Sequence, residues 1–157
     1  MSKLEMSLQA AMNARIIGSG TLMNELHLTS SVFIGHSMSG MIGCIASIKR
    51  PQLFSRLILV GASPRCLKSM NPEFVVPLAK IVFCSDERET LEKVTTPCTI
   101  IQTTNDLVVP ESVAYYMQKK IKGETTVEIV KADRHLPQLT AHLELVHVLG
   151  RVLGFEI

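Results

Sequence analysis

The sequence predicts an α/β domain in which about four parallel strands alternate with helices. Two observations support this prediction: short apolar, β-branched runs recur along the chain, and longer stretches with helical spacing separate them. The 157 residues, 46% of them hydrophobic and 19% charged, are enough for one compact core. We therefore expect a half-size, doubly wound domain.

The first crossover is predicted by two strands around one helix. Ser31 to Gly35 (SVFIG) and Arg56 to Ala62 (RLILVGA) are short and apolar, and Ser37 to Lys49 between them has helical spacing. After a turn at Ser63-Pro64-Arg65, a further helix is expected to begin near Pro72, because proline fits the first helical position. Its apolar side would carry Phe74, Leu78, Ile81 and Val82.

The second half of the chain repeats the pattern. Asp86 to Glu89 is expected to be a solvated turn, because acidic and basic residues alternate there. Strands are predicted at Cys98 to Thr103 and Thr126 to Val130, and the helix between them opens at Val109-Pro110-Glu111 and stops at Gly123. The apolar face of this helix would carry Val113, Tyr116, Met117 and Ile121.

The hydrophobic pattern is clear at the C-terminal end of the chain but not at the N-terminal end. A single helix is predicted from about Gln138 to Leu153. Residues 1–30 show no such pattern: Ala14 to Ile17 could form a short strand before a Gly-Ser-Gly turn, but no second strand follows. We therefore divide the chain into a poorly defined segment, 1–30, and a structured unit, 31–157.

Charge and cysteine usage exclude several classes of protein. The net charge is +2, and the basic stretch Lys119 to Lys122 is more typical of a solvated helix end than of a nucleic-acid patch. No secretory signal or apolar run of about 18 residues is present, so we expect no membrane contact and a cytoplasmic or nuclear location. His142 and His147 do not share a helix face, so we expect neither metal nor cofactor. The cysteines form no CxxC pair, and we expect buried, reduced thiols at Cys44, Cys66, Cys84 and Cys98.

Ser37 occupies the predicted turn from the first strand into its helix. A serine at such a turn, flanked by small residues, is typical of a nucleophile elbow, whose usual pattern is G-x-S-x-G. Here Gly35 fits the first position, Ser39 stands at the fifth, and Gly40 follows it. The alternative is that these small residues only allow close helix packing.

A serine nucleophile needs a base and an orienting carboxylate. Asp106 follows the third predicted strand and His135 the fourth, and Ser, Asp, His is the order found with the elbow pattern. Each has another interpretation, because Asn-Asp is a common turn and a histidine beside proline is often a surface loop residue. Reactive groups gather at the carboxyl ends of parallel strands, so we expect the three side chains to meet there.

Four stretches together carry a family resemblance: GHSMSGMIGCIASIKRPQLFSRLILVGASPR, LAKIVFCSDERE, NDLVVPESVAYYMQKKIKG and HLPQLTAHLELV. They resemble the plant strigolactone and karrikin receptor family of α/β-hydrolases, most of all its third branch, the DWARF-fourteen-like paralogues. The resemblance covers about Ser31 to Ile157, and the piece AAMNARIIGSG is similar to the family's N-terminus. It implies that residues 31–157 are the C-terminal half of an α/β-hydrolase domain.

The resemblance also implies a function. Ser37 would be the nucleophile, His135 the base, Asp106 its orienting partner and the Met38 N–H an oxyanion donor. In the family, this triad slowly hydrolyses butenolide hormones, and the ligand-driven change of a helical lid recruits an F-box protein and repressor targets. No cofactor is implied.

Three departures from the family pattern stand out. The strands and the HGFG-type loop expected after Gly20 are missing, and with them one oxyanion N–H. No lid domain lies between Leu67 and Lys68, and Arg134 stands where the family has glycine, which could displace His135. We therefore expect a partial α/β-hydrolase fold with impaired hydrolysis.

The missing strands would also leave SVFIG as an unpaired sheet edge. Such an edge invites dimerisation. The alternative function is therefore that of a non-catalytic remnant that acts, if at all, by pairing with a full-length relative.

Overall fold

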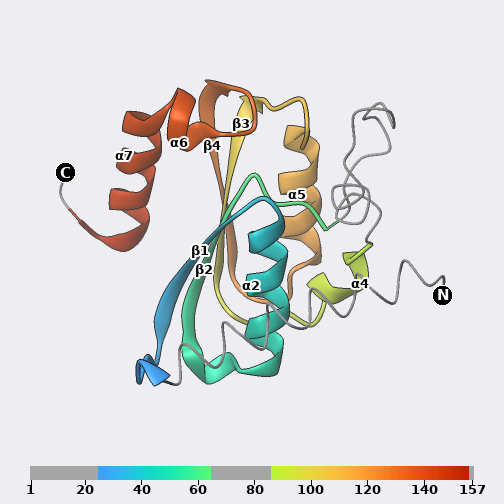
Figure 1. Ribbon diagram of the computed structural model, residues 1–157. Helices are drawn as coiled ribbons and strands as arrows, with labels where there is room; N and C mark the ends of the chain where they lie inside the picture. Colours follow the sequence, from blue (N-terminus) through green and yellow to red (C-terminus); the bar gives the residue numbers. More distant parts are fainter. Residues whose placement is uncertain (1–24, 65–85, 156–157) are drawn as a thin grey trace.

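The computed structural model describes residues 25–64 and 86–155 (Figure 1). The strands are β1 (Ser31–His36), β2 (Phe54–Val60), β3 (Cys98–Asn105) and β4 (Thr125–Asp133). The helices are α2 (Met38–Lys49), α4 (Arg88–Leu91), α5 (Glu111–Lys120), α6 (Pro137–Thr140) and α7 (His142–Leu153), with a 3-10 turn at Pro51–Leu53. The predicted strand at residues 14–17, the helix near Pro72, and Cys66 and Cys84 lie outside the described residues.

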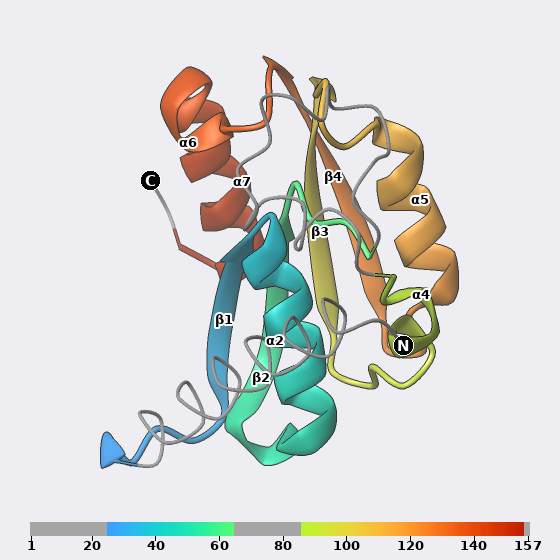
Figure 2. The ribbon, with the colours of Figure 1, turned by 45° about the vertical axis from the view of Figure 1, so that its right-hand side comes forward.

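The four strands form one parallel sheet in the order β1-β2-β3-β4. The predicted parallel α/β architecture is confirmed. Figures 1 and 2 show α2 and α5 covering one face of the sheet and α7 the other. Because all four strands are parallel, the loops that follow them lie at the same end of the sheet, where a site can form.

β2 lies inside the sheet and is buried on both faces. Leu57 and Leu59 belong to the core between the sheet and α2 and α5, whereas Ile58 and Val60 belong to the core under α7. This alternation follows from the period of two along a strand, and a strand covered on both faces has a continuous apolar run. Truncating a fully buried leucine here to alanine would cost about 2–5 kcal/mol of stability.

β1 is an edge strand and pairs with β2 alone in the described part of the chain. Phe33 points into the core and contacts the Phe54 ring edge-on at a centroid distance of 6.0 Å. Val32 and Ile34 point to the other face and are 43% and 50% exposed. The expected open, apolar edge is therefore present within residues 25–64 and 86–155.

Two predicted elements need correction. The final helix is wrong as one continuous element: α6 ends and α7 begins around the buried Ala141, whose φ of −150° leaves the helical region. This break lets α7 turn back onto the sheet. Asp86 to Glu89 is exposed or half-exposed but is not only a turn, because α4 begins at Arg88, whose backbone N–H lies 3.2 Å from a carboxylate oxygen of Asp86.

The apolar face of α5 also differs in one position. Met117 and Ile121 are buried as predicted, but Tyr116 is 36% exposed and Ala114 is fully buried. Ala114 is three residues before Met117 and shares its face of the helix. Its small side chain lets α5 approach the sheet closely, whereas the Tyr116 ring lies on the outer side.

The two described cysteines behave as predicted. Cys44 and Cys98 are both free and buried. Burial raises the pKa of the Cys98 thiol to about 12 and also raises the pKa of the Cys44 thiol. Both therefore act as apolar core groups at neutral pH. None of the helices in the described ranges is long and apolar enough to cross a membrane.

Candidate active site

Ser37 lies in a strained turn between β1 and α2. Its φ of 55° and ψ of −123° lie in a sparsely populated region for a residue with a side chain. Its backbone N–H donates to the Val60 carbonyl at 2.9 Å, which ties the turn to the end of β2. Such a conformation costs on the order of 1–3 kcal/mol, so the surrounding structure must impose it.

The glycines of the turn explain the altered elbow pattern. A Cβ on Gly35 would lie 2.7 Å from the backbone nitrogen of Gly40, and a Cβ on Gly40 would lie 2.6 Å from the Cβ of Ala62. The close approach between helix and sheet therefore falls at position 40. Ser39, at the usual glycine position, donates a hydrogen bond through its Oγ to the His36 carbonyl at 2.8 Å.

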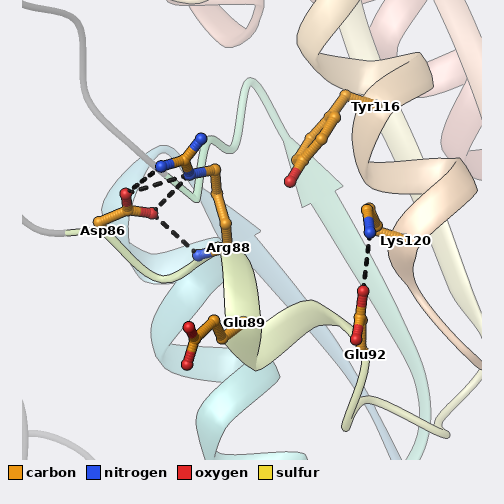
Figure 3. A pocket seen from close by; sticks show the side chains of 6 residues that line it. All are labelled: Asp86, Arg88, Glu89, Glu92, Tyr116 and Lys120. Carbon is orange, nitrogen blue, oxygen red and sulfur yellow. Dashed lines mark hydrogen bonds and ion pairs between the residues drawn. The ribbon is translucent and has the colours of Figure 1, made fainter.

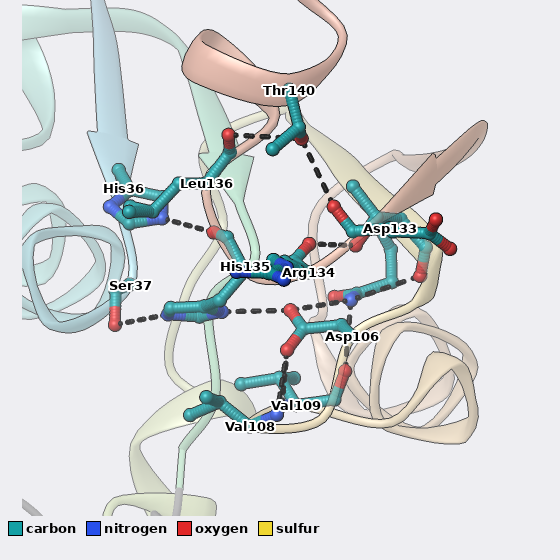
Figure 4. A network of polar contacts seen from close by, with 12 residues as sticks. His36, Ser37, Asp106, Val108, Val109, Asp133, Arg134, His135, Leu136 and Thr140 are labelled. Atoms are coloured by element: carbon teal, nitrogen blue, oxygen red, sulfur yellow. Dashed lines mark hydrogen bonds and ion pairs between the residues drawn. The ribbon is translucent and has the colours of Figure 1, made fainter.

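The structure brings the three sequence-predicted side chains into one line of hydrogen bonds (Figure 4). His135 Nε2 lies 2.9 Å from Ser37 Oγ, and His135 Nδ1 lies 2.7 Å from Asp106 Oδ2. With a proton on Nδ1, the ring donates to the carboxylate and leaves Nε2 to accept the serine proton. The Asp106 side chain is 1% exposed and that of His135 16%, so the line runs from the interior toward the surface.

Asp106 is held by donors on both of its oxygens. The backbone N–H groups of Val108 and Val109 donate to Oδ1 at 2.8 and 2.9 Å, and Gln102 Nε2 donates to Oδ2 at 3.1 Å. Burial raises the pKa of the carboxyl group. The hydrogen bonds from His135 and the two backbone groups outweigh burial, so the pKa lies below its usual value. The carboxylate therefore stays charged beside the imidazole.

Sequence reasoning missed Gln102. It lies in β3, is 1% exposed, and its Nε2 also donates to the Val109 carbonyl at 2.9 Å. The amide thereby closes the turn that carries Asp106 at both ends. The signal in the sequence was a single large polar residue inside the apolar run CTIIQT. A buried amide in such a strand needs hydrogen-bond partners, and here they are Asp106 and the Val109 carbonyl.

Gly61 follows β2 and lies against the ring of His135. Its φ is +53°, and a Cβ there would come within 3.2 Å of His135 Cε1 and 3.7 Å of Asp106 Oδ2. Glycine is required both by this backbone conformation and by the nearby ring. The sequence analysis placed this residue inside a strand, but β2 ends at Val60.

Arg134 does not displace His135. It adopts a φ of 73°, its N–H donates to the Asn105 carbonyl at 3.0 Å, and its own carbonyl accepts from Thr103 Oγ1 at 2.8 Å. The expected displacement is therefore wrong. The backbone absorbs the missing glycine by taking the left-handed conformation that glycine would take more easily.

Met38 is the first residue of α2, directly after Ser37. The first N–H groups of a helix have no carbonyl partner within the helix, so they are available to a developing negative charge. The oxyanion role of Met38 stays a prediction. Among the described residues, no cluster of three or more His, Cys, Asp or Glu side chains could hold a metal ion.

A cleft of about 530 Å³ lies apart from this line of residues (Figure 3). It is lined by Asp86, Arg88, Glu89, Glu92, Tyr116 and Lys120. Arg88 pairs with Asp86 at 2.6 Å and Lys120 with Glu92 at 2.8 Å, so these charges neutralise one another at an exposed surface. None of the residues that line this cleft belongs to the line of Ser37, His135 and Asp106.

No family model matches the chain. Curated proteins do: the strigolactone esterase RMS3 of Pisum sativum is 33% identical, over 85% of this chain and 70% of its own length. The karrikin insensitive 2 receptor IA of Petunia hybrida is 30% identical, over 87% of this chain and 69% of its own length. Among solved structures, the esterase EaEST from Exiguobacterium antarcticum shares the fold with a TM-score of 0.77 at 18% identity, over 91% of this chain and 74% of that one.

The lengths of these matches are informative. The match to the pea esterase runs over 186 aligned positions, which exceeds the 157 residues of this chain. The relative therefore has internal residues without a counterpart here, which agrees with the predicted internal gaps. With an identity above 30% over more than two thirds of the relative, and with the fold of solved hydrolases, the chain belongs to the strigolactone esterase and karrikin receptor family of α/β-hydrolases.

Proposed function

We propose that this chain is a serine hydrolase of small butenolide-like esters, with Ser37 as nucleophile, His135 as base and Asp106 as its orienting partner. The observation that supports this most is the continuous line of hydrogen bonds, at 2.9 and 2.7 Å, from Ser37 through His135 to Asp106. The ester substrate follows from relatives that are named strigolactone esterases.

The proposed chemistry runs along this line of hydrogen bonds. Ser37 Oγ attacks the ester carbonyl while its proton moves to His135 Nε2, and Asp106 stabilises the imidazolium that forms. In this proposal, the Met38 N–H donates to the negatively charged oxygen of the tetrahedral intermediate. His135 then protonates the departing alcohol. In the second half of the reaction, His135 takes a proton from a water molecule that attacks the acyl-serine, and it returns this proton to Ser37 Oγ as the acid leaves.

We expect this hydrolysis to be slow. A single oxyanion donor would leave the intermediate less stabilised, and the loss of one such donor typically costs about 10²–10³ in rate. A missing lid would also leave the ester exposed to water and without a pocket roof. Because the lid also forms the partner surface in the family, we expect weak recruitment of F-box and repressor partners. We propose that the protein acts in the cytoplasm or nucleus.

The test is covalent labelling by a fluorophosphonate, measured by intact mass on the purified protein. We expect one adduct that disappears in Ser37→Ala and in His135→Ala. Ser112→Ala is the matched control, since Ser112 is exposed on α5, and it should label like the parent protein. Labelling that persists in Ser37→Ala, or no labelling of the folded parent, would refute the proposed chemistry.

A second candidate function is favoured by the open edge of the sheet. β1 contains no charged residue or proline, and its outward Val32 and Ile34 are half-exposed, so the edge lacks the usual protection against pairing. We propose that two copies pair their β1 edges antiparallel, as two-fold symmetry requires.

Light scattering after size exclusion tests this dimer. Ile34→Lys should give a monomer, whereas Leu143→Lys, at an exposed apolar position on α7, should leave the dimer intact. A parent protein that is monomeric at all concentrations would refute self-pairing. Capture of a full-length relative by that monomer would point to the remnant role instead.

A further inference from the structure

His36, the residue directly before Ser37, makes a contact that the mechanism above does not use. Its Nε2 lies 2.8 Å from the backbone carbonyl oxygen of His135 (Figure 4). A carbonyl oxygen can only accept, so Nε2 must carry the proton and donate it. The tautomer of His36 in this contact is therefore fixed.

This hydrogen bond crosses the end of the sheet. β1 carries His36 and the loop after β4 carries His135, and two strands lie between them in the sheet. The two imidazole rings also contact each other at a centroid distance of 4.8 Å and an interplanar angle of 48°. The bond therefore joins the neighbour of the nucleophile directly to the backbone of the base.

Other hydrogen bonds to the loop after β4 come from β3. Thr103 and Asn105 of β3 hold the backbone of Arg134, and they fix the loop relative to Asp106. They do not fix it relative to Ser37. The hydrogen bond from His36 fixes the loop relative to β1, and hence relative to Ser37.

We propose that His36 is a positioning residue that sets the distance between His135 Nε2 and Ser37 Oγ. This inference rests on the proposed hydrolase function. The Nε2–H of His36 holds the His135 backbone toward β1, and the His36 ring packs against the His135 ring. The base therefore faces the serine. Displacing a reacting group by about 1 Å can cost on the order of 10²-fold in rate.

Two substitutions separate the donor from the packing. The amide nitrogen of glutamine can take the place of histidine Nε2, so His36→Gln should label within a few-fold of the parent rate. His36→Phe keeps a ring without a donor, and we expect its rate of phosphonylation and its kcat to fall about 10- to 100-fold. KM should change little, because His36 is not expected to touch the ester. His147→Phe, on the exposed side of α7, is the matched control and should react like the parent.

A second readout does not depend on reactivity. The proton on His135 Nδ1, shared with Asp106, should give a low-field NMR signal. We expect this signal to persist in His36→Gln and to shift or broaden in His36→Phe. If His36→Phe does not fold by circular dichroism, His36→Met replaces it as the variant without a donor.

The outcomes are distinct. Loss in His36→Phe with rescue in His36→Gln supports the proposal, whereas equal rates in both, or equal losses in both, would overturn it. If the folded parent does not label at all, the proposed hydrolase function fails. The NMR signal then decides the positioning role alone, and an unchanged signal in His36→Phe would refute it.

Discussion

Substituting Gly61 with alanine tests how tightly the backbone after β2 constrains the His135 ring. The left-handed φ of +53° costs a residue with a Cβ about 1–2 kcal/mol. The smaller entropy of the unfolded alanine chain offsets about 0.4–1 kcal/mol of this. The new Cβ would also lie 3.2 to 3.3 Å from the ring of His135, closer than an ordinary van der Waals contact, so the ring must move by a few tenths of an ångström. We expect a net destabilisation of about 1 kcal/mol and, in addition, a roughly 10-fold slower phosphonylation of Ser37.

Gly154 provides a matched control for this experiment. It has a φ of +75° at the end of α7, and a Cβ there would meet no atom within 4 Å. Gly154→Ala should therefore show the same loss in urea denaturation without any loss of labelling rate. If Gly61→Ala labels at the parent rate, or if Gly154→Ala slows labelling equally, the argument that Gly61 makes room for His135 is wrong.

Three further predictions follow from the site. Arg134→Gly should raise the free energy of unfolding by about 0.5–1 kcal/mol, because its φ of 73° is strained and its described hydrogen bonds are made by the backbone; a loss in chemical denaturation would contradict this. Gln102→Met should destabilise the fold by about 1–2 kcal/mol, because Asp106 Oδ2 and the Val109 carbonyl each lose a buried donor. Chemical denaturation measures this, and an unchanged midpoint would refute the structural role of Gln102. The folded pKa of Asp106 lies below its unfolded value near 3.9, so its contribution to stability is complete above about pH 5 and is lost as the pH falls through the folded pKa. Asp106→Asn should therefore lose less stability than the parent between pH 7 and pH 3, and a parallel decline in both would argue against this linkage.

Much of the site could be predicted from the sequence because its signals are local. Ser37 stands at a strand-to-helix turn, and Asp106 and His135 each follow a strand of a parallel sheet. The topology of such a sheet brings the ends of its strands to one edge. Order along the chain and residue type were therefore enough to anticipate which side chains meet.

The remainder depends on tertiary contacts that have no local signature. Gly61 resembles any strand residue until the imidazole beside it is placed. Gln102 has a pattern compatible with an ordinary strand, and its role appears only when the turn after β3 folds over it. Ala141 is a good helix former, yet the helix breaks there because α7 must return to the sheet. In each case, packing overrides a weaker local preference.

The position of β1 at the edge of the sheet has a consequence for how the protein would lose its reactivity. In the described part of the chain, β1 is bonded to one neighbour only, and an edge strand of this kind is the part of a sheet most easily lost by local opening. Ser37 follows β1 directly and is tied to β2 by one backbone hydrogen bond, to Val60, whereas Asp106 follows β3 and His135 follows β4. Fraying of this one strand would thus separate Ser37 from His135 while the interior between β2 and α7 remains folded. Reactivity toward a phosphonate would then disappear on warming before the core melts.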